Sequence, residues 1–211
     1  MSRSNLAFAK DNYISPEDYL TSEREAFEKH EFINGEIVAM AGASENHNVI
    51  ASNLFGELFM QLKNTKCRAF ASDMRVKAVK AKKSNYFYPD IVVTCGERKF
   101  EDGKRDVLLN PQVIIEVLSK STRLKDRNEK LASYFAQESV TDYVLVEQDT
   151  MHVEHYSRID RENWNMRLLS ESSHDLVLDS INCRISLTDV YNEIKFEAVS
   201  DKRKNRKLKA N

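Results

Sequence analysis

Tyr88-Pro89-Asp90-Ile91-Val92-Val93 and Val113-Ile114-Ile115-Glu116-Val117-Leu118 are the two segments around which the chain is organised. Each is a short apolar run rich in β-branched residues, which is typical of a buried strand, with one carboxylate set into it. A carboxylate in such a place is costly unless it is paired, hydrogen-bonded or bound to a metal. Two of them, on strands that we expect to lie side by side, indicate a divalent-cation site, and hard oxygen ligands suit Mg²⁺ or Mn²⁺.

Each acid also has a simpler explanation. An aspartate after proline at a strand start, as Asp90 is, is often a turn or edge residue. A glutamate in an apolar run, as Glu116 is, is often paired with a buried arginine or lysine. Neither short motif alone separates a functional residue from a structural one, so the rest of the sequence has to decide.

Length and composition are those of a globular domain. The 211 residues fit one domain with extensions, and with 41% hydrophobic and 31% charged residues they can bury a sizeable core. No apolar run approaches the roughly 20 residues of a membrane helix. The first residues also lack the apolar stretch of a signal peptide, so we expect a cytoplasmic protein without membrane contact. Cys67, Cys95 and Cys183 are scattered and form no CxxC, so they indicate neither a zinc site nor a disulfide framework.

The charge is distributed unevenly along the chain. The net charge is −1, but residues 202–209 hold six basic residues and no acid. Residues 1–201 therefore hold 26 basic and 33 acidic side chains, a net charge of −7. The tail is either a phosphate-binding arm or, as such runs more often are, a solvated and disordered end. We assign residues 1–12 to an N-terminal extension, 13–197 to a single domain and 198–211 to this tail.

Capping residues, turn residues and hydrophobic periodicity predict the secondary structure of the domain. Ser15-Pro16 and Ser44 open helices, and Asn34-Gly35 between two alternating runs is a strong hairpin signal. On the predicted helices Phe27 and Leu124 face inward. The predicted elements are a helix 15–27, the hairpin 31–38, a helix 44–62, strands 67–78 and 86–95 around a basic loop, a short helix 105–109, a strand 113–118, a helix 124–138, strands 142–148, 151–158, 165–170 and 174–178, and a helix 187–196.

These elements surround Asp90 and, after 25 intervening residues, Glu116. The segments that carry a family resemblance are HEFINGEIVAMAGAS with HN after it, SDMRVK, YPDIVV, LNPQVIIEVLSKST and DRNEKLASYFAQESVTDYVLVEQD. With them the chain resembles the Uma2 (DUF820) group of the PD-(D/E)XK nuclease superfamily over roughly residues 13–195. The resemblance implies an α/β fold with a mixed α+β sheet: a restriction endonuclease-like core preceded by a helix and a hairpin.

The resemblance also implies which residues form the site. Asp90 matches the PD aspartate and Glu116 the acidic residue of (D/E)XK, but Leu118 stands where the superfamily has its lysine. Uma2 proteins suggest a lysine on the following helix, and Lys130 occupies that place. Lys120, which keeps strand parity with Glu116, is the rival.

The implied chemistry is metal-assisted hydrolysis of a phosphodiester bond. Asp90 and Glu116 would hold Mg²⁺, with Mn²⁺ as the alternative, and Lys130 would orient or help to deprotonate the attacking water. For Asp126 a surface ion pair with Lys130 is the simpler explanation, and for His47 inward packing at the first turn of its helix. The second-rank candidates are Glu36, His47, Asp73, Lys120 and Asp126.

The expected substrate is DNA, in double-stranded form, which requires contacts to phosphates. Candidates for these contacts are Lys80, Lys82, Lys83, Arg98 and Lys104, all in predicted loops. A homodimer is expected by analogy, since cutting both strands of a duplex takes two sites.

Two other interpretations remain open. The missing lysine at position 118 and the acidic body favour a catalytically inactive nuclease fold that serves as a binding or regulatory module. A carbohydrate-active enzyme with Asp90 and Glu116 as its carboxylate pair is disfavoured, because the chain has a single tryptophan for a sugar platform.

Overall fold

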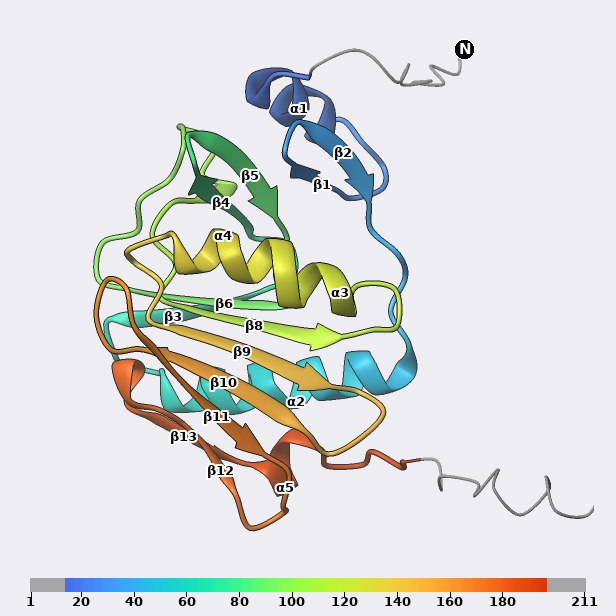
Figure 1. The fold of residues 1–211 in the computed structure, drawn as a ribbon, viewed down its shortest axis with the longest axis vertical. Coiled ribbons are helices and arrows are strands. Elements are labelled where there is room, and N and C mark those ends of the chain that lie inside the picture. Colours follow the sequence, from blue (N-terminus) through green and yellow to red (C-terminus); the bar gives the residue numbers. More distant parts are fainter. Residues whose placement is uncertain (1–13, 197–211) are drawn as a thin grey trace, which may run out of the picture.

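The computed structural model describes residues 14–196, which form two sheets, a two-stranded ribbon and several helices (Figure 1). The helices are α1 (Pro16–Glu23), α2 (Glu45–Gln61), α3 (Arg123–Lys125), the π-helix η1 (Asp126–Lys130), α4 (Leu131–Phe135), the 3₁₀-helix η2 (Asp179–Ile181) and α5 (Leu187–Val190). The strands are β1 (His30–Ile33), β2 (Glu36–Ala39), β3 (Cys67–Ala71), β4 (Arg75–Lys80), β5 (Lys83–Phe87), β6 (Ile91–Cys95), β7 (Val107–Leu108), β8 (Val113–Leu118), β9 (Asp142–Glu147), β10 (Val153–Arg158), β11 (Trp164–Leu169), β12 (Asp175–Leu178) and β13 (Cys183–Ser186).

The larger sheet is mixed and has six strands in the order β11-β10-β9-β8-β6-β3. Strands β8 and β9 are parallel, because the chain returns between them through the helical segment 123–135. The smaller sheet has five strands in the order β2-β1-β5-β4-β7, and β12 pairs with β13 in the ribbon. The predicted α/β fold with a mixed α+β sheet is confirmed.

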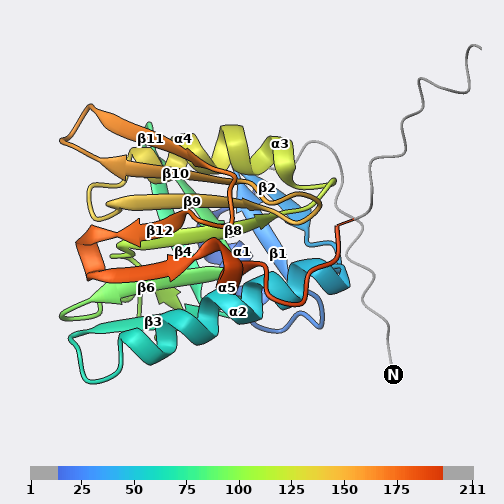
Figure 2. The ribbon, with the colours of Figure 1, turned by 90° about the horizontal axis from the view of Figure 1, so that it is seen from below.

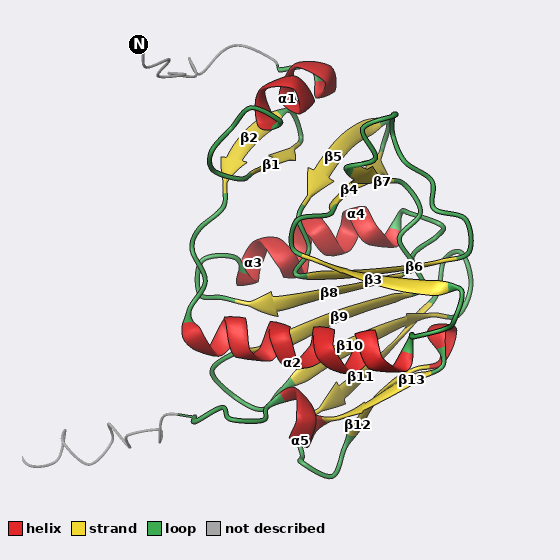
Figure 3. Ribbon diagram, turned by 180° about the vertical axis from the view of Figure 1, so that it is seen from behind, coloured by secondary structure: helices red, strands yellow, loops and turns green. Residues whose placement is uncertain are grey.

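Helices cover both faces of the six-stranded sheet (Figure 2). Helix α2 lies on one face and the helical segment 123–135 on the other, as the reverse view also shows (Figure 3). On β8, Ile115 and Val117 belong to the core under α2, whereas Ile114 and Leu118 belong to the core under α4. Because side chains alternate along a strand, Glu116 faces the helical segment 123–135.

Several predicted elements are confirmed in place. Asn34 and Gly35 have φ of 54° and 96°, which is the backbone that a tight hairpin turn requires. The Ser44 side chain caps α2 by accepting the backbone N–H of His47 at 3.2 Å.

Other elements differ from the prediction for physical reasons. Helix α1 ends at Glu23, so Phe27 lies beyond the helical period and is exposed. Leu124 is exposed. The π-turn of η1 holds more residues per turn than an α-helix, and this shifts Leu124 out of line with the buried positions that follow it. The predicted strand 67–78 is two strands, β3 and β4. Instead of the predicted helix at 105–109, β7 pairs in parallel with β4. Helix α5 is shorter than predicted, and β13 was not predicted.

The cysteines also differ from the prediction. Cys67 of β3 and Cys95 of β6 are directly opposite in the sheet register and form a disulfide, while Cys183 is free and buried. The expectation of no disulfide was wrong because the sequence separation of 28 residues concealed a cross-strand pair.

The proposed N-terminal extension and basic tail lie wholly outside the described residues. In residues 14–196 no helix is long and apolar enough to span a membrane.

Candidate functional site

Lys130 lies at the centre of a buried cluster of carboxylates. Its Nζ is 2.9 Å from Glu31 Oε1 of β1, 3.0 Å from Glu116 Oε1 of β8 and 3.2 Å from Asp126 Oδ1 of η1. The side chains of the lysine and of all three acids are at most 5% exposed. We call Glu31, Glu116, Asp126 and Lys130 the lysine cluster. The structure thus brings Lys130 to Glu116.

The π-helix η1 presents Asp126 and Lys130 to the sheet. The backbone N–H of Leu131 reaches back five residues to the Asp126 carbonyl, which also accepts the Tyr143 hydroxyl at 2.9 Å. This wider turn buries both the acid and the base of the i, i+4 pair against β8. The simpler explanation of a surface ion pair between them does not hold, because the helix packs this row inward.

Glu31 is the cluster member that the sequence prediction missed. It sits on β1 with the same parity as Ile33, whose side chain is buried in the core under α4. That parity was the available signal, because alternate residues of a strand share a face. Glu36 was chosen instead. It pairs with Ile33 next to the hairpin turn and is exposed, so it takes no part in the cluster.

Asp90 lies outside the lysine cluster, between the end of β8 and the start of α2. Its Oδ2 accepts the backbone N–H of Val117 at 2.7 Å and lies 3.2 Å from His47 Nε2. Because β6 and β8 are adjacent and antiparallel, Asp90 and Glu116 lie at neighbouring strand ends. Asp90 opens into a cavity of about 210 Å³ between α2 and β3, whereas Glu116 is buried.

Burial and charge shift the pKa values of this site. Burial, followed by the nearby charges of Asp126, Asp90 and Glu31, raises the pKa of Glu116 well above its usual value, although Lys130 opposes the shift. Burial alone would lower the pKa of Lys130, but the surrounding carboxylates outweigh it and raise that pKa well above its usual value. Burial likewise opposes protonation of His47, yet the hydrogen bond and charge of Asp90 raise its pKa. Lys130 is therefore a cation held by carboxylates.

The donor chemistry fits a hard divalent cation. Four carboxylates converge on the strand ends, and oxygen is the ligand that Mg²⁺ prefers. Two buried polar atoms nearby, His47 Nδ1 and Tyr134 Oη, have no hydrogen-bond partner among the described residues. Within residues 14–196 no three acidic, histidine or cysteine side chains are already spaced to hold a metal, and the Lys130 ammonium sits between the carboxylates instead.

The remaining predicted residues lie elsewhere. The side chain of Asp73 is 89% exposed and pairs with Lys29. Lys120 is exposed in a loop near Ser44 and is outside the lysine cluster. The predicted phosphate contacts Lys80, Lys82, Lys83, Arg98 and Lys104 are all exposed, on loops or at loop edges away from the lysine cluster.

A mixed sheet with helices on both faces and acids at the ends of adjacent central strands defines a protein of the restriction-endonuclease-like class. A family model for Uma2, described as "Putative restriction endonuclease", matches residues 16–188. The chain belongs to the Uma2 family.

The chain is also similar to individual proteins and to a solved structure. The chain is 37% identical over 159 residues to the uncharacterized protein sll1609 of Synechocystis, covering 75% of this chain and 89% of that one. It is 33% identical over 183 residues to slr1290 of the same organism, covering 87% and 94%. The fold is similar to the crystal structure of a "putative nuclease belonging to DUF820" from Anabaena variabilis, with a TM-score of 0.69, 19% identity, and 84% and 97% of the two chains covered. The predicted family and fold class are confirmed.

Proposed function

We propose that this protein is a Mg²⁺-dependent endonuclease that hydrolyses phosphodiester bonds of DNA, and that Lys130 replaces the lysine missing at position 118. The observation that carries the proposal is the 3.0 Å contact between Lys130 Nζ and Glu116 Oε1, on the strand beside Asp90, in a chain of the Uma2 family. Double-stranded DNA as the substrate and a homodimer as the active form remain parts of this proposal.

Asp90 and Glu116 would hold the metal, which when bound polarises the scissile phosphate and acidifies a bound water. The Val117 N–H and His47 fix the orientation of the Asp90 carboxylate. Glu31 and Asp126 keep the Lys130 side chain extended toward Glu116. The Lys130 ammonium would then orient the attacking water and stabilise negative charge that develops on the phosphoryl oxygens.

A plasmid-nicking assay with Mg²⁺ and with Mn²⁺ tests the proposal. The variants are Asp90→Asn, Glu116→Gln, Lys130→Met and the rival Lys120→Ala. We expect metal-dependent nicking by the wild type, a loss of at least about 100-fold in the first three variants, and retained nicking in Lys120→Ala. Asp90→Asn can still accept the Val117 N–H, so this variant tests the carboxylate with little disturbance of the fold.

Two results would contradict the proposal. Nicking that survives Asp90→Asn would place the activity elsewhere or in a contaminant. A wild type that neither cuts DNA nor binds either metal by calorimetry would instead support the alternative of an inactive nuclease-fold binding module. One observation favours that alternative: in the described region no three side chains are already spaced to hold a metal.

A further inference from the structure

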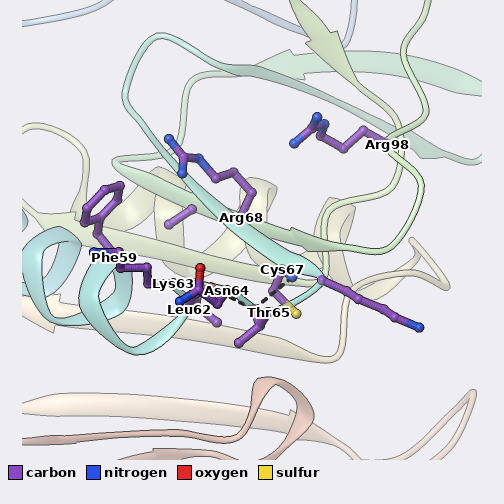
Figure 4. A pocket seen from close by; sticks show the side chains of 10 residues that line it. Phe59, Leu62, Lys63, Asn64, Thr65, Cys67, Arg68 and Arg98 are labelled. Carbon is purple, nitrogen blue, oxygen red and sulfur yellow. Dashed lines mark hydrogen bonds between the residues drawn. The ribbon is translucent and has the colours of Figure 1, made fainter.

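A second cavity, of about 380 Å³, lies at the far end of β3 and β6 from Asp90 and has a basic lining (Figure 4). Its basic lining residues are Lys63, Lys66, Arg68 and Arg98, and no carboxylate lines it in the described part of the chain. Arg68 comes from β3 and Arg98 from the loop after β6, and both side chains line this cavity. Two separate segments thus bring positive charge to one place.

The charges of this cavity are unneutralised. The ion pairs found within residues 14–196 involve other lysines and arginines, not these four. The same region holds 24 basic and 30 acidic side chains, yet four basic groups gather at this cavity without a carboxylate among its lining residues. Such a concentration attracts an anion with several charges.

The basic cavity and the cavity beside Asp90 lie along the same two elements, α2 and β3. Phe55 of α2 and Ala71 of β3 line the cavity at Asp90, while Phe59, one helical turn later, and Ala69, two residues earlier on β3, line the basic one. The rings of Phe55 and Phe59 are stacked with centroids 6.2 Å apart. Both cavities therefore follow the line where α2 meets β3, and we call the two together the α2–β3 groove.

An exposed aromatic ring lies inside this groove. Phe59 is 40% exposed, and the Arg68 guanidinium lies 5.2 Å from the centre of its ring. An aromatic ring beside unpaired arginine is a surface on which a nucleotide base can stack while its phosphate meets the charge.

We propose that the α2–β3 groove binds the phosphodiester backbone of one substrate strand to one side of the scissile bond, with Arg68 and Arg98 as its phosphate contacts. This inference rests on the proposed nuclease function. Ala71, beside Asp90, and Cys67, in the basic cavity, are four steps apart along β3, which corresponds to about 13 Å. A B-form strand advances 3.4 Å per nucleotide, so these contacts fall about four nucleotides from the bond to be cut.

The test measures nucleic-acid binding without cutting. Fluorescence anisotropy is recorded over a salt series on the Asp90→Asn protein without metal, with a labelled duplex and a labelled single strand of equal length. The groove variant adds Arg68→Gln and Arg98→Gln. The matched control adds Arg161→Gln and Arg167→Gln, which remove the same charge from exposed positions near β11, at the opposite edge of the six-stranded sheet.

We expect the groove variant to bind more weakly, with a log–log salt slope shallower by about 1.8 on the duplex or about 1.4 on the single strand, and the control to keep the parent slope. The probe that shows the change identifies the form of the substrate. Equal slopes in the groove variant and the control would overturn the inference, and so would a parent protein that binds neither probe. Because no cutting is measured, either failure leaves the nicking assay to judge the proposed function separately.

Discussion

At the scale of single residues, the main question is how one lysine is kept buried beside three carboxylates. Lys130 offsets the desolvation of Glu31, Glu116 and Asp126, and they in turn stabilise its charge. The cluster is therefore stable only as a unit. Removing one partner from such a group lowers the free energy of unfolding by more than the ion pair contributes to it, because an unpaired charge stays buried.

This interdependence predicts the effect of removing the lysine on stability. Lys130→Met should lower the free energy of unfolding at neutral pH by about 3–5 kcal/mol, measured by urea denaturation. The exposed Lys99→Met should change it by less than about 0.5 kcal/mol. In the double variant Glu116→Gln/Lys130→Met part of the loss should be recovered, because one buried charge is gone. Strictly additive effects would argue that Lys130 and Glu116 are not coupled.

A second ion-pair group predicts a pH dependence of stability. The hydrogen bond from Arg24, and then the charges of Arg75 and Arg24, lower the pKa of Asp106 below its usual 3.8 in spite of its partial burial. A carboxyl whose folded pKa is depressed stabilises the protein above its unfolded pKa, and this contribution is lost as the pH falls through the folded pKa. Asp106→Asn should thus cost on the order of 1 kcal/mol at neutral pH and progressively less below pH 3.8.

Chemical denaturation of Asp106→Asn and wild type at a series of pH values measures this difference. Glu25→Gln, at an exposed position with no ion pair among the described residues, serves as the control and should show no such trend. A difference that stays constant down to the acid end would show that the Asp106 pair contributes nothing through its charge.

At the scale of elements, the cross-strand disulfide between β3 and β6 is the feature to test. The structure predicts that a denatured but unreduced chain takes up one alkyl group, at Cys183, and three after reduction. In Cys183→Ala the unreduced chain should take up none. Mass spectrometry counts the labels, and three labels without reduction would mean that Cys67 and Cys95 are thiols. Reduction should lower the free energy of unfolding by about 3.6 kcal/mol for a loop closed over 28 residues.

The helices and strands also show how much of the structure could be predicted from local sequence signals. Local signals located the hairpin at Asn34-Gly35, the cap at Ser44, the strand that follows Asp90 and the strand that carries Glu116, because those signals are complete within a few residues. The π-turn of η1 has no such signal, since it depends on packing against β8 and β9. Glu31 and the disulfide likewise arise from pairing between segments distant in sequence, which no local pattern specifies.

At the scale of the whole molecule, the candidate site joins the two sheets. Glu31 comes from the five-stranded sheet, whereas Asp90 precedes and Glu116 lies within strands of the six-stranded sheet. A cation held by Asp90 and Glu116 requires β6 and β8 of the six-stranded sheet in their native pairing, so it binds the folded chain only. Under the proposed function, Mg²⁺ or Mn²⁺ should therefore stabilise the entire fold.

A metal present at ten times its dissociation constant adds about 1.4 kcal/mol to the free energy of unfolding. For a domain of this size the melting temperature should rise by about 3–6 °C, measured by calorimetry with and without metal. Asp90→Asn should melt at one temperature in both conditions, because a carboxylate proposed to hold the cation is missing. Asp179→Asn, which removes an exposed carboxylate outside the site, should keep the full shift and so excludes a general effect of salt on an acidic protein. An equal shift in Asp90→Asn would mean that the cation stabilises the fold from another place, and the nuclease mechanism built on Asp90 would lose its support.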